Sequence, residues 1–459
     1  MTFILVTNED VNIVENDLMR NLILIMKIWK KTTYMVAIYL FLLEFRPLEP
    51  FMTAYLIGPD ANLSLKEVAT TIEYLKTYAS LLTSVLMFMT ADYFLYKPNI
   101  IFLTVCPCVS YFLMIGAPSV TQLRVSAFGI GAIYSGNMIA LCYLYAKIDD
   151  VEQYQMATGI VTAAIQLGKV VGDFSAQIIV SATGGIYTIL PYCNIFSLLL
   201  AIIWACLFPS IKQKNDPCEN SSLLKHGVDN ETKNIEQNRN TIKIDKEYKT
   251  EIFFSKEIWM NFKSSYSNPI VLKKSLWYIV GMGAYILVLS NINVLYSYVI
   301  KIPGNHDVLS NGLAESMVTL SGAAGAYLIG KVNCDWARYG DVFTAFCSIV
   351  MGTLMMSCYF YHKLKFIYLA YILFGLICQM HFVVIYAEIA KQLKKQCYSL
   401  IIEFNFFGSL IVVTILTLIL IQYNIMYITI PGRFLFIGGL FLMLGIIFLF
   451  VCIYDIRKK

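Results

Sequence analysis

The stretch that decides the fold is Glu44–Asp60, which reads Glu-Phe-Arg-Pro-Leu-Glu-Pro-Phe-Met-Thr-Ala-Tyr-Leu-Ile-Gly-Pro-Asp. It follows the apolar run Thr32–Leu43, which is too short to cross a bilayer because a crossing takes about 20 residues. The first membrane helix is therefore predicted to continue through this charged stretch to about Ile57.

Three ionisable residues and two prolines interrupt that predicted helix, namely Glu44, Arg46, Pro47, Glu49 and Pro50. A charge at that depth costs about 2.5–3.5 kcal/mol and has to face protein or water. Each proline removes a backbone hydrogen bond, which is tolerable only against neighbouring helices or a cavity. We expect the stretch to form one wall of a polar path through an apolar protein.

The composition indicates an all-α protein that crosses a membrane many times. Its 459 residues are 58% hydrophobic and 14% charged, with a mean hydropathy of +0.65, whereas a soluble domain has roughly 25% charged residues. The net charge of +5 does not indicate a nucleic-acid partner, because the basic residues lie between apolar runs, where they orient the chain in a lipid bilayer.

Metal, cofactor and catalytic sites are not expected. The 12 cysteines are scattered, mostly inside apolar runs, and no CxxC pair occurs. Cys106-Pro-Cys108 is the nearest approach to one and is typical of helix packing. The four histidines are far apart in the sequence, unlike clustered metal ligands: His226, His306, His362 and His381. With no nucleotide motif either, an enzyme is not predicted.

Charge patterning predicts both ends of the chain in the cytosol. Basic residues precede the first crossing, at Arg20, Lys27, Lys30 and Lys31, and positive residues favour the inner face. The predicted division is an N-terminal segment 1–31, a six-helix bundle 32–209, a largely disordered cytosolic linker 210–270, a second six-helix bundle 271–455 and a tail 456–459. The linker's mixture of charged and polar residues supports its assignment.

After the first crossing, eleven more are predicted. Asn62-Leu63-Ser64 falls in the first outer loop and makes Asn62 a predicted N-glycosylation site. The turn His362–Lys365 falls outside, against the positive-inside rule. The predicted spans are Ile72–Phe94, Asn99–Ala117, Gln122–Ala146, Tyr154–Thr183, Ile186–Phe208, Leu272–Val299, Gly312–Val332, Tyr339–Tyr361, Lys365–Ala390, Tyr398–Tyr423 and Ile430–Tyr454.

Twelve helices in two halves joined by a long inner linker are the organisation of the major facilitator transporters. A weak internal repeat agrees with this, because corresponding inner turns of both halves place an aspartate shortly before a basic residue. The pairs are Asp92 with Lys97 and Asp335 with Arg338. These turns resemble the charge latch of that superfamily, and the four residues are predicted to form it.

The charged stretch also resembles the first helix of the reduced folate and thiamine carriers, solute carrier family nineteen. The similarity lies in Arg46-Pro47-Leu48-Glu49-Pro50-Phe51 and in Tyr55–Leu63. Shorter matches follow at Asp92–Pro98, Tyr143–Tyr145, Ser275–Trp277 and Asn311–Glu315. The resemblance implies a plasma-membrane carrier of thiamine or reduced folate that works by alternating access without ATP hydrolysis, with a site between the halves near the midplane.

The resemblance implies site residues unevenly. Glu49 matches a glutamate that lines the family's cavity, and Glu315 matches an acidic position of the eighth helix. Asn137 stands where thiamine carriers have glutamate and the folate carrier has arginine, and Lys76 where some thiamine carriers have a stacking tryptophan. Gly375 and Val413 replace an arginine and a lysine of the folate carrier.

The charges of the two candidate substrates, thiamine and reduced folate, call for different site residues. Reduced folate is a dianion that needs fixed cations, whereas thiamine is an aromatic cation that needs carboxylates and aromatic faces. Glu49 and Glu315 could supply the carboxylates, and Tyr134 and Tyr296 the aromatic faces, which favours a thiamine-like cation. The folate or organic-anion alternative stays open, as do a receptor without flux and a proton or organic anion as counter-substrate.

Several of these residues could instead have purely structural roles. Arg46 and Glu49 could be a structural pair, and Lys76 could extend toward water at the outer mouth. Lys169 and Asp173 are four residues apart on one helix face, where they could neutralise each other or line the pathway. The tyrosines could serve only in packing or as interface anchors.

Overall fold

The computed structural model describes residues 28–58, 74–116, 118–211, 258–300, 302, 311–394, 397–422 and 428–458. The predicted glycosylation site Asn62 and most of the predicted linker and N-terminal segment lie outside these ranges. Within them the secondary structure is helical, without a strand. Seven of the described helices are long and apolar enough to cross a membrane, and two further apolar helices are shorter.

Each predicted crossing corresponds to a described helix. The first consists of a helix over 28–44, a short 3₁₀ turn Glu49–Phe51 and α2 (Met52–Ile57). The other elements of the N-terminal half are α4 (Tyr74–Thr90), α5 (Lys97–Leu113), α6 (Val120–Lys147), α7 (Tyr154–Ala182) and α8 (Leu190–Cys206). The C-terminal half contains α10 (Pro269–Ile300), α11 (Asn311–Lys331), α12 (Trp336–Phe360), α13 (Leu364–Gln392), α14 (Tyr398–Thr417) and α15 (Ile430–Lys458).

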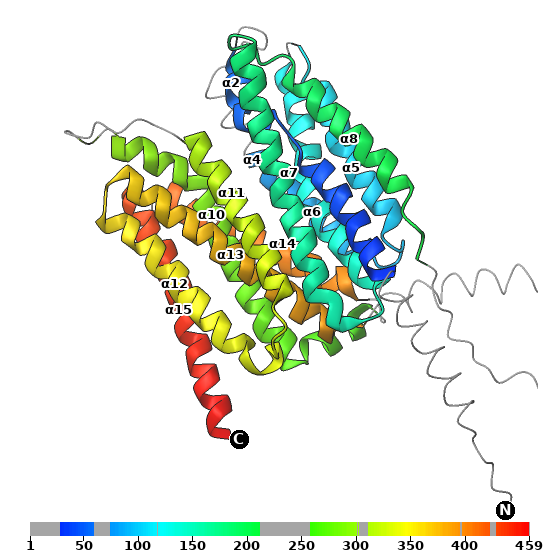
Figure 1. Ribbon diagram of the computed structural model, residues 1–459, viewed down its shortest axis with the longest axis vertical. Coiled ribbons are helices and arrows are strands. Elements are labelled where there is room, and N and C mark those ends of the chain that lie inside the picture. The colour runs from blue at the N-terminus through cyan, green and yellow to red at the C-terminus, as the bar shows by residue number, and fades with distance from the viewer. Residues whose placement is uncertain are drawn as a thin grey trace, which may run out of the picture.

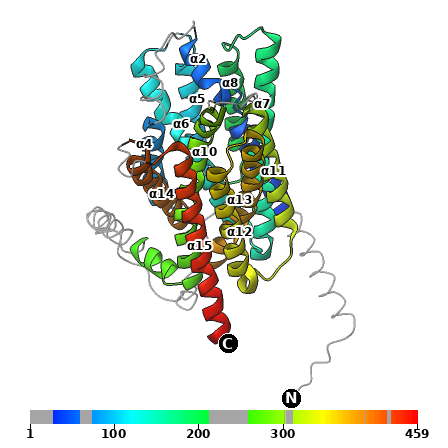
Figure 2. The same ribbon diagram turned by 90° about the vertical axis from the view of Figure 1, so that its left-hand side faces the viewer.

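The helices pack as two bundles that we call the N-terminal half (28–211) and the C-terminal half (258–458). In the former, α6 lies against α4 and α5, and α5 lies against α8; in the latter, α12 lies against α15 and α13, and α10 against α13 and α14. The halves meet mainly where α7 lies against α11 and α4 against α14 (Figures 1 and 2), and α13 and α14 also contact α7 and α6, respectively.

The halves meet tightly where α7 begins and α11 ends, a region that we call the closed end. A Cβ atom on Gly159 would lie 2.7 Å from the carbonyl oxygen of Ala326 and 2.8 Å from the Cα of Gly330. Gln155 Nε2 donates to the carbonyl of Ile329 at 2.7 Å. Small residues allow two helix backbones to approach this closely, so glycine on both helices is what permits this contact.

Asp92 joins α4 to α14 at the same end. Its carboxylate accepts hydrogen bonds from the backbone N–H groups of Ser399 (3.1 Å) and Leu400 (2.8 Å), and from the hydroxyl of Tyr96. The N-cap residue Cys397 makes no side-chain cap bond. Asp92 therefore caps the first turn of α14 from the other half, where a negative charge also complements the helix dipole.

The other three predicted latch residues do not bridge the halves through any ion pair or hydrogen bond seen in the described ranges. Lys97 Nζ donates to the carbonyl of Cys206 at 2.8 Å, within its own half. Asp335 precedes α12 without a side-chain cap bond, and the guanidinium of Arg338 lies 5.4 Å from the ring centre of Tyr339. Among the four predicted latch residues, the described hydrogen bonds and ion pairs place Asp92 alone between the halves.

Replacing Gly330 with valine should weaken the contact between the two halves at the closed end. The added side chain would meet Gly159, and overpacking of this kind costs about 1–3 kcal/mol. Amide hydrogen exchange of residues 154–163, measured by mass spectrometry on protein in lipid nanodiscs, should rise by about tenfold or more. Gly439→Val is the matched control, because a Cβ on Gly439 meets nothing within 4 Å. Equal exchange in both variants would contradict the assigned contact.

The Asp92 contact should depend on pH. Burial raises the pKa of Asp92 to about 6 from its ordinary 3.8, so closure binds a proton that an exposed Asp92 would release. The stabilisation of the closed end by the Asp92 proton is therefore fully present below about pH 4 and is lost as pH rises through about 6. Hydrogen exchange of residues 397–403, corrected for intrinsic rates, should increase over this window by at most about tenfold per pH unit. Asp92→Asn should flatten this response, and a retained response would refute the assignment.

Candidate functional site

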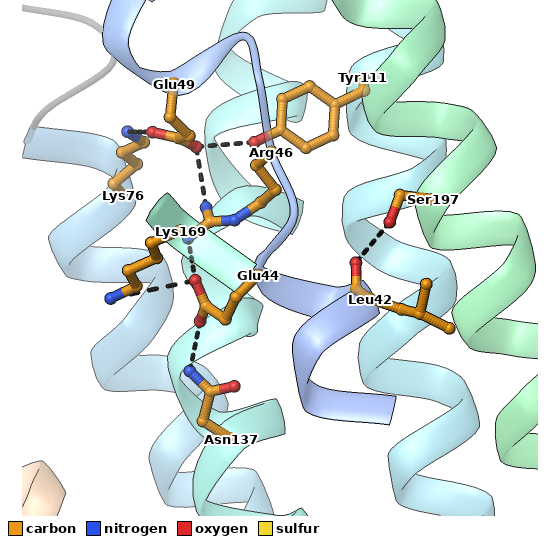
Figure 3. Close-up of polar contacts among 9 residues, drawn as sticks. All are labelled: Leu42, Glu44, Arg46, Glu49, Lys76, Tyr111, Asn137, Lys169 and Ser197. Carbon is orange, nitrogen blue, oxygen red and sulfur yellow. Dashed lines mark hydrogen bonds and ion pairs between the residues drawn. The ribbon is translucent and has the colours of Figure 1, made fainter. Parts of the chain in front are cut away.

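The first crossing is broken at its prolines, and α8 repairs the break. The backbone N–H of Leu48 donates to Asn194 Oδ1 at 3.0 Å. Ser197 Oγ donates to the carbonyl of Leu42 at 2.7 Å, as Figure 3 shows. Both side chains come from α8 and satisfy backbone groups that a continuous helix would have paired internally. An unwound segment inside a membrane protein requires such partners.

Glycines of α7 let the broken segment lie against that helix. A Cβ on Gly168 would lie 2.6 Å from the carbonyl oxygen of Phe41, and one on Gly172 would lie 3.0 Å from the backbone nitrogen of Arg46. The two glycines are one helical turn apart and form one face. Their neighbours Lys169 and Asp173 are thereby brought beside the charged stretch.

Arg46 lies between two carboxylates of its own segment. Its guanidinium donates to Glu44 Oε2 at 2.6 Å and to Glu49 Oε1 at 2.9 Å. The Glu44 side chain is only 1% exposed and also accepts a hydrogen bond from Asn137 Nδ2 at 2.6 Å. Asn137 therefore positions a buried carboxylate of the predicted path (Figure 3).

Glu49 is the more accessible carboxylate of this group. Its side chain is 27% exposed. Oε1 accepts a hydrogen bond from the Tyr111 hydroxyl at 2.6 Å, and Oε2 lies 3.7 Å from Lys76 Nζ. Structural pairing and exposure to the cavity thus occur together: Glu49 is bound to Arg46, yet it still faces open space, and Lys76 reaches it from α4 (Figure 3).

A cavity of about 200 Å³ lies beside these residues and is lined by both halves. A smaller one, of about 50 Å³, shares Lys169, Glu315 and Thr319 with it and adds Tyr285 and Gln379 of the C-terminal half. We call the two together the central cavity. The lining of the larger part comprises Glu44, Arg46, Glu49, Pro50, Lys169, Asp173, Glu315 and Thr319.

Lys169 and Asp173 both line the larger part of the central cavity. The ammonium of Lys169 lies 4.0 Å from Glu44 Oε2, and no ion pair between Lys169 and Asp173 occurs in the described ranges. The pairing of Lys169 with Glu44 joins α7 to the first crossing, which a sequence pattern on α7 alone does not show. Asp173 lines the same cavity and forms no ion pair within 4.0 Å with another described residue.

Glu315 faces the same cavity from α11. Its carboxylate accepts hydrogen bonds from the Tyr371 hydroxyl at 3.2 and 3.3 Å. Next to it, Gln379 Nε2 donates to the Tyr285 hydroxyl at 3.1 Å. The wall on the C-terminal side therefore consists of one carboxylate surrounded by neutral polar and aromatic groups.

The two predicted aromatic residues lie in different surroundings. The Tyr134 side chain is 46% exposed, and its ring centre lies 6.2 Å from that of Phe406 in the other half. Tyr296 is buried and packs edge-on against Tyr368 with ring centres 4.7 Å apart, and it is not among the residues that line the central cavity. Tyr134 is therefore placed between the halves, whereas Tyr296 belongs to the helix packing.

The formal charge of the cavity wall is negative. Its larger part has four carboxylates, Glu44, Glu49, Asp173 and Glu315, against two cations, Arg46 and Lys169, which leaves a formal charge of −2 if all are ionised. Adding Lys76, which lies beside Glu49, makes it −1. Such a wall favours a positively charged ligand. In the described part of the chain, no group of three metal-ligating side chains is found.

Comparison with known proteins agrees with the resemblance in the first helix. The model of the reduced folate carrier family matches residues 27–436. Folate transporter 1 of Caenorhabditis elegans is 25% identical over 407 residues, which cover 88% of each chain. Thiamine transporter 2 of Homo sapiens is 24% identical over 437 residues, covering 89% of this chain and 87% of the other.

Solved structures support the fold. The human organic anion transporter MFSD10 superposes with a TM-score of 0.62 at 11% identity, covering 92% of this chain and 99% of the other. The proton:xylose symporter XylE of the major facilitator superfamily gives 0.65 at 10% identity, covering 92% and 95%. The predicted all-α major facilitator fold is therefore confirmed, and so is the expectation that the protein is a transporter-type membrane protein rather than an enzyme. With its family model matching most of its length, the chain belongs to the reduced folate carrier family.

Proposed function

We propose that this protein transports a cationic vitamin, thiamine or a thiamine-like molecule, across the plasma membrane by alternating access. The observation that carries the proposal is the pair Asp173 and Glu315. They come from α7 and α11, on opposite halves, and line one cavity. A cation between them would be attracted by both halves at once, and that attraction would favour closure of the halves around it.

The cations of the cavity are already engaged. Arg46 lies within 2.9 Å of both Glu44 and Glu49, Lys76 within 3.7 Å of Glu49, and Lys169 within 4.0 Å of Glu44. A dianion such as reduced folate would have to compete with these carboxylates for the cations. A cation needs no such exchange.

The positions where the folate carrier has basic residues support the same choice. Gly375 lines the smaller part of the central cavity, and Val413 is buried in α14, so neither gives the wall a positive charge. Aromatic groups beside the cavity, such as Tyr285, could stack on an aminopyrimidine ring. Folate transport is the alternative, favoured by the folate transporter among the relatives and by Lys169, the most exposed of these cations.

The proposed mechanism places both termini in the cytosol. With that orientation the closed end faces the cytosol, and the central cavity faces the outside. Transport would then require the contacts of Asp92 and of Gly159 with Gly330 to open while the halves approach each other around the substrate, as in rocking of one repeat against the other.

The decisive experiment is uptake of labelled thiamine and, separately, labelled reduced folate by cells that lack their own carriers. Saturable thiamine uptake is expected, and Asp173→Asn and Glu315→Gln should each lower it by about tenfold or more, because each removes about 1.4 kcal/mol or more of attraction to a cation. Glu152→Gln is the matched control, since Glu152 is exposed in the short 3₁₀ helix before α7. Surface expression is measured for every variant.

Three outcomes would contradict the proposal. Saturable folate uptake without thiamine uptake would favour the anion alternative. Saturable thiamine binding to purified protein without counterflow in vesicles would indicate a receptor that does not transport. Full thiamine uptake by both carboxylate variants would remove Asp173 and Glu315 from the site.

Glu49→Gln should also abolish thiamine uptake while surface expression stays intact. The change removes a charge that faces the cavity and leaves Arg46 and Lys76 with one carboxylate fewer, so the wall becomes less attractive to a cation. The measurement is the kinetics of uptake, normalised to protein at the surface. Kinetics equal to those of the unmodified protein would exclude Glu49 from the substrate site.

A further inference from the structure

One buried carboxyl group outside the central cavity lacks the hydrogen-bond and ion-pair partners that such a group normally has. Glu403 of α14 is 0% exposed; among the described residues the hydroxyls of Ser84 and Ser135 lie near its carboxyl, but neither carboxyl oxygen makes a hydrogen bond of good geometry. It does not line the central cavity and forms none of the ion pairs seen between described residues. The fold therefore holds a fully buried acid that the substrate site does not use.

The groups that face Glu403 are neutral. The hydroxyls of Ser84 on α4 and Ser135 on α6 lie beside its carboxyl. These two hydroxyls hydrogen-bond to each other at 3.3 Å. The other titratable side chains near it are Cys142 of α6, Tyr278 of α10 and Tyr386 of α13. They include no basic residue that could compensate a carboxylate.

An isolated carboxylate in such surroundings is very costly, whereas a neutral carboxylic acid is not. We propose that Glu403 is a proton-binding site whose proton stabilises the closed end, and that opening of this end releases the proton to the adjoining water. The carboxylic acid O–H bond breaks on opening, the proton passes to water and a hydrated carboxylate remains; closure reverses the step.

The position of Glu403 links its proton to opening. Ser399 and Glu403 are one helical turn apart on α14 and share a face. Ser399 binds α4 through its hydroxyl, which donates to the carbonyl of Met87 at 3.0 Å, and through its N–H, which donates to Asp92. When α14 separates from α4, the contact with Ser84 is lost on the same face and water reaches the carboxyl.

The sign of the effect follows from this linkage. Because the proton is bound in the closed form and released from the open one, a higher pH at the closed end favours opening. The link to transport rests on the alternating access proposed above. In that cycle, each opening of the closed end would release the Glu403 proton, and each closure would bind one again. The ligand of the site is the proton itself.

Infrared spectroscopy of the purified protein tests the site without any substrate. At about pH 7.5, where Asp92 is ionised, the carbonyl stretch of a protonated carboxyl should be present and should lose intensity in Glu403→Gln. Glu388→Gln is the matched control, because Glu388 is also buried but pairs with Lys391 at 3.0 Å and should contribute no such band. A band that is unchanged in Glu403→Gln would overturn the proposal.

Hydrogen exchange of residues 397–403 tests the link to opening. Above about pH 7 the unmodified protein should exchange faster as pH rises, whereas Glu403→Gln, which keeps the shape of a neutral acid, should stay closed and lose this response. If that variant does not fold, titration of the unmodified protein decides: the protonated band and the closed contact should be lost together. Loss of one without the other would overturn the link. Neither readout involves a vitamin, so these failures are distinct from failure of the proposed transport.

Discussion

The guanidinium of Arg46, held between Glu44 and Glu49 within a proline-broken helix, is the constraint on which the rest of the structure depends. Such charges exist inside a membrane only where protein or water faces them. The surroundings meet that requirement in detail. Asn194 and Ser197 of α8 satisfy the broken backbone, Gly168 and Gly172 let it approach α7, and the charged side chains open onto one cavity.

The polar side chains of the described chain are divided between the central cavity and the closed end. In the middle, carboxylates outnumber cations, and those of α7 and α11 face each other from different halves. At the closed end, close backbone contact between Gly159 and Gly330 and the capping of α14 by Asp92 hold the halves together. A transporter that rocks needs both: contacts that are specific enough to close one end and a polar cavity that changes when a ligand enters.

The sequence predicted the helices and the charged wall well, because apolar runs and intramembrane charges are strong local signals. It predicted Glu49, Glu315 and Asn137 near one path but not their partners. Tyr111, Tyr371 and Asn194 come from helices that contact the site only after folding, and Lys169 pairs with Glu44 of the first crossing rather than with Asp173 along its own helix. Tyr296 illustrates the opposite case, since an aromatic residue in an apolar run gives no indication of which face it occupies. Glu403 was equally visible in the sequence, as a lone acid in an apolar helix, and only its unpaired burial shows that it is unusual.

The central claim is that Asp173 and Glu315 hold a cation between the halves while Arg46 stays paired. The most direct measurement is an experimental structure of the protein with thiamine bound. The account predicts the ligand between the carboxylates of Asp173 and Glu315, with the pairs of Arg46 to Glu44 and Glu49 intact. Thiamine bound elsewhere, or Arg46 released from both glutamates to contact the ligand, would contradict it.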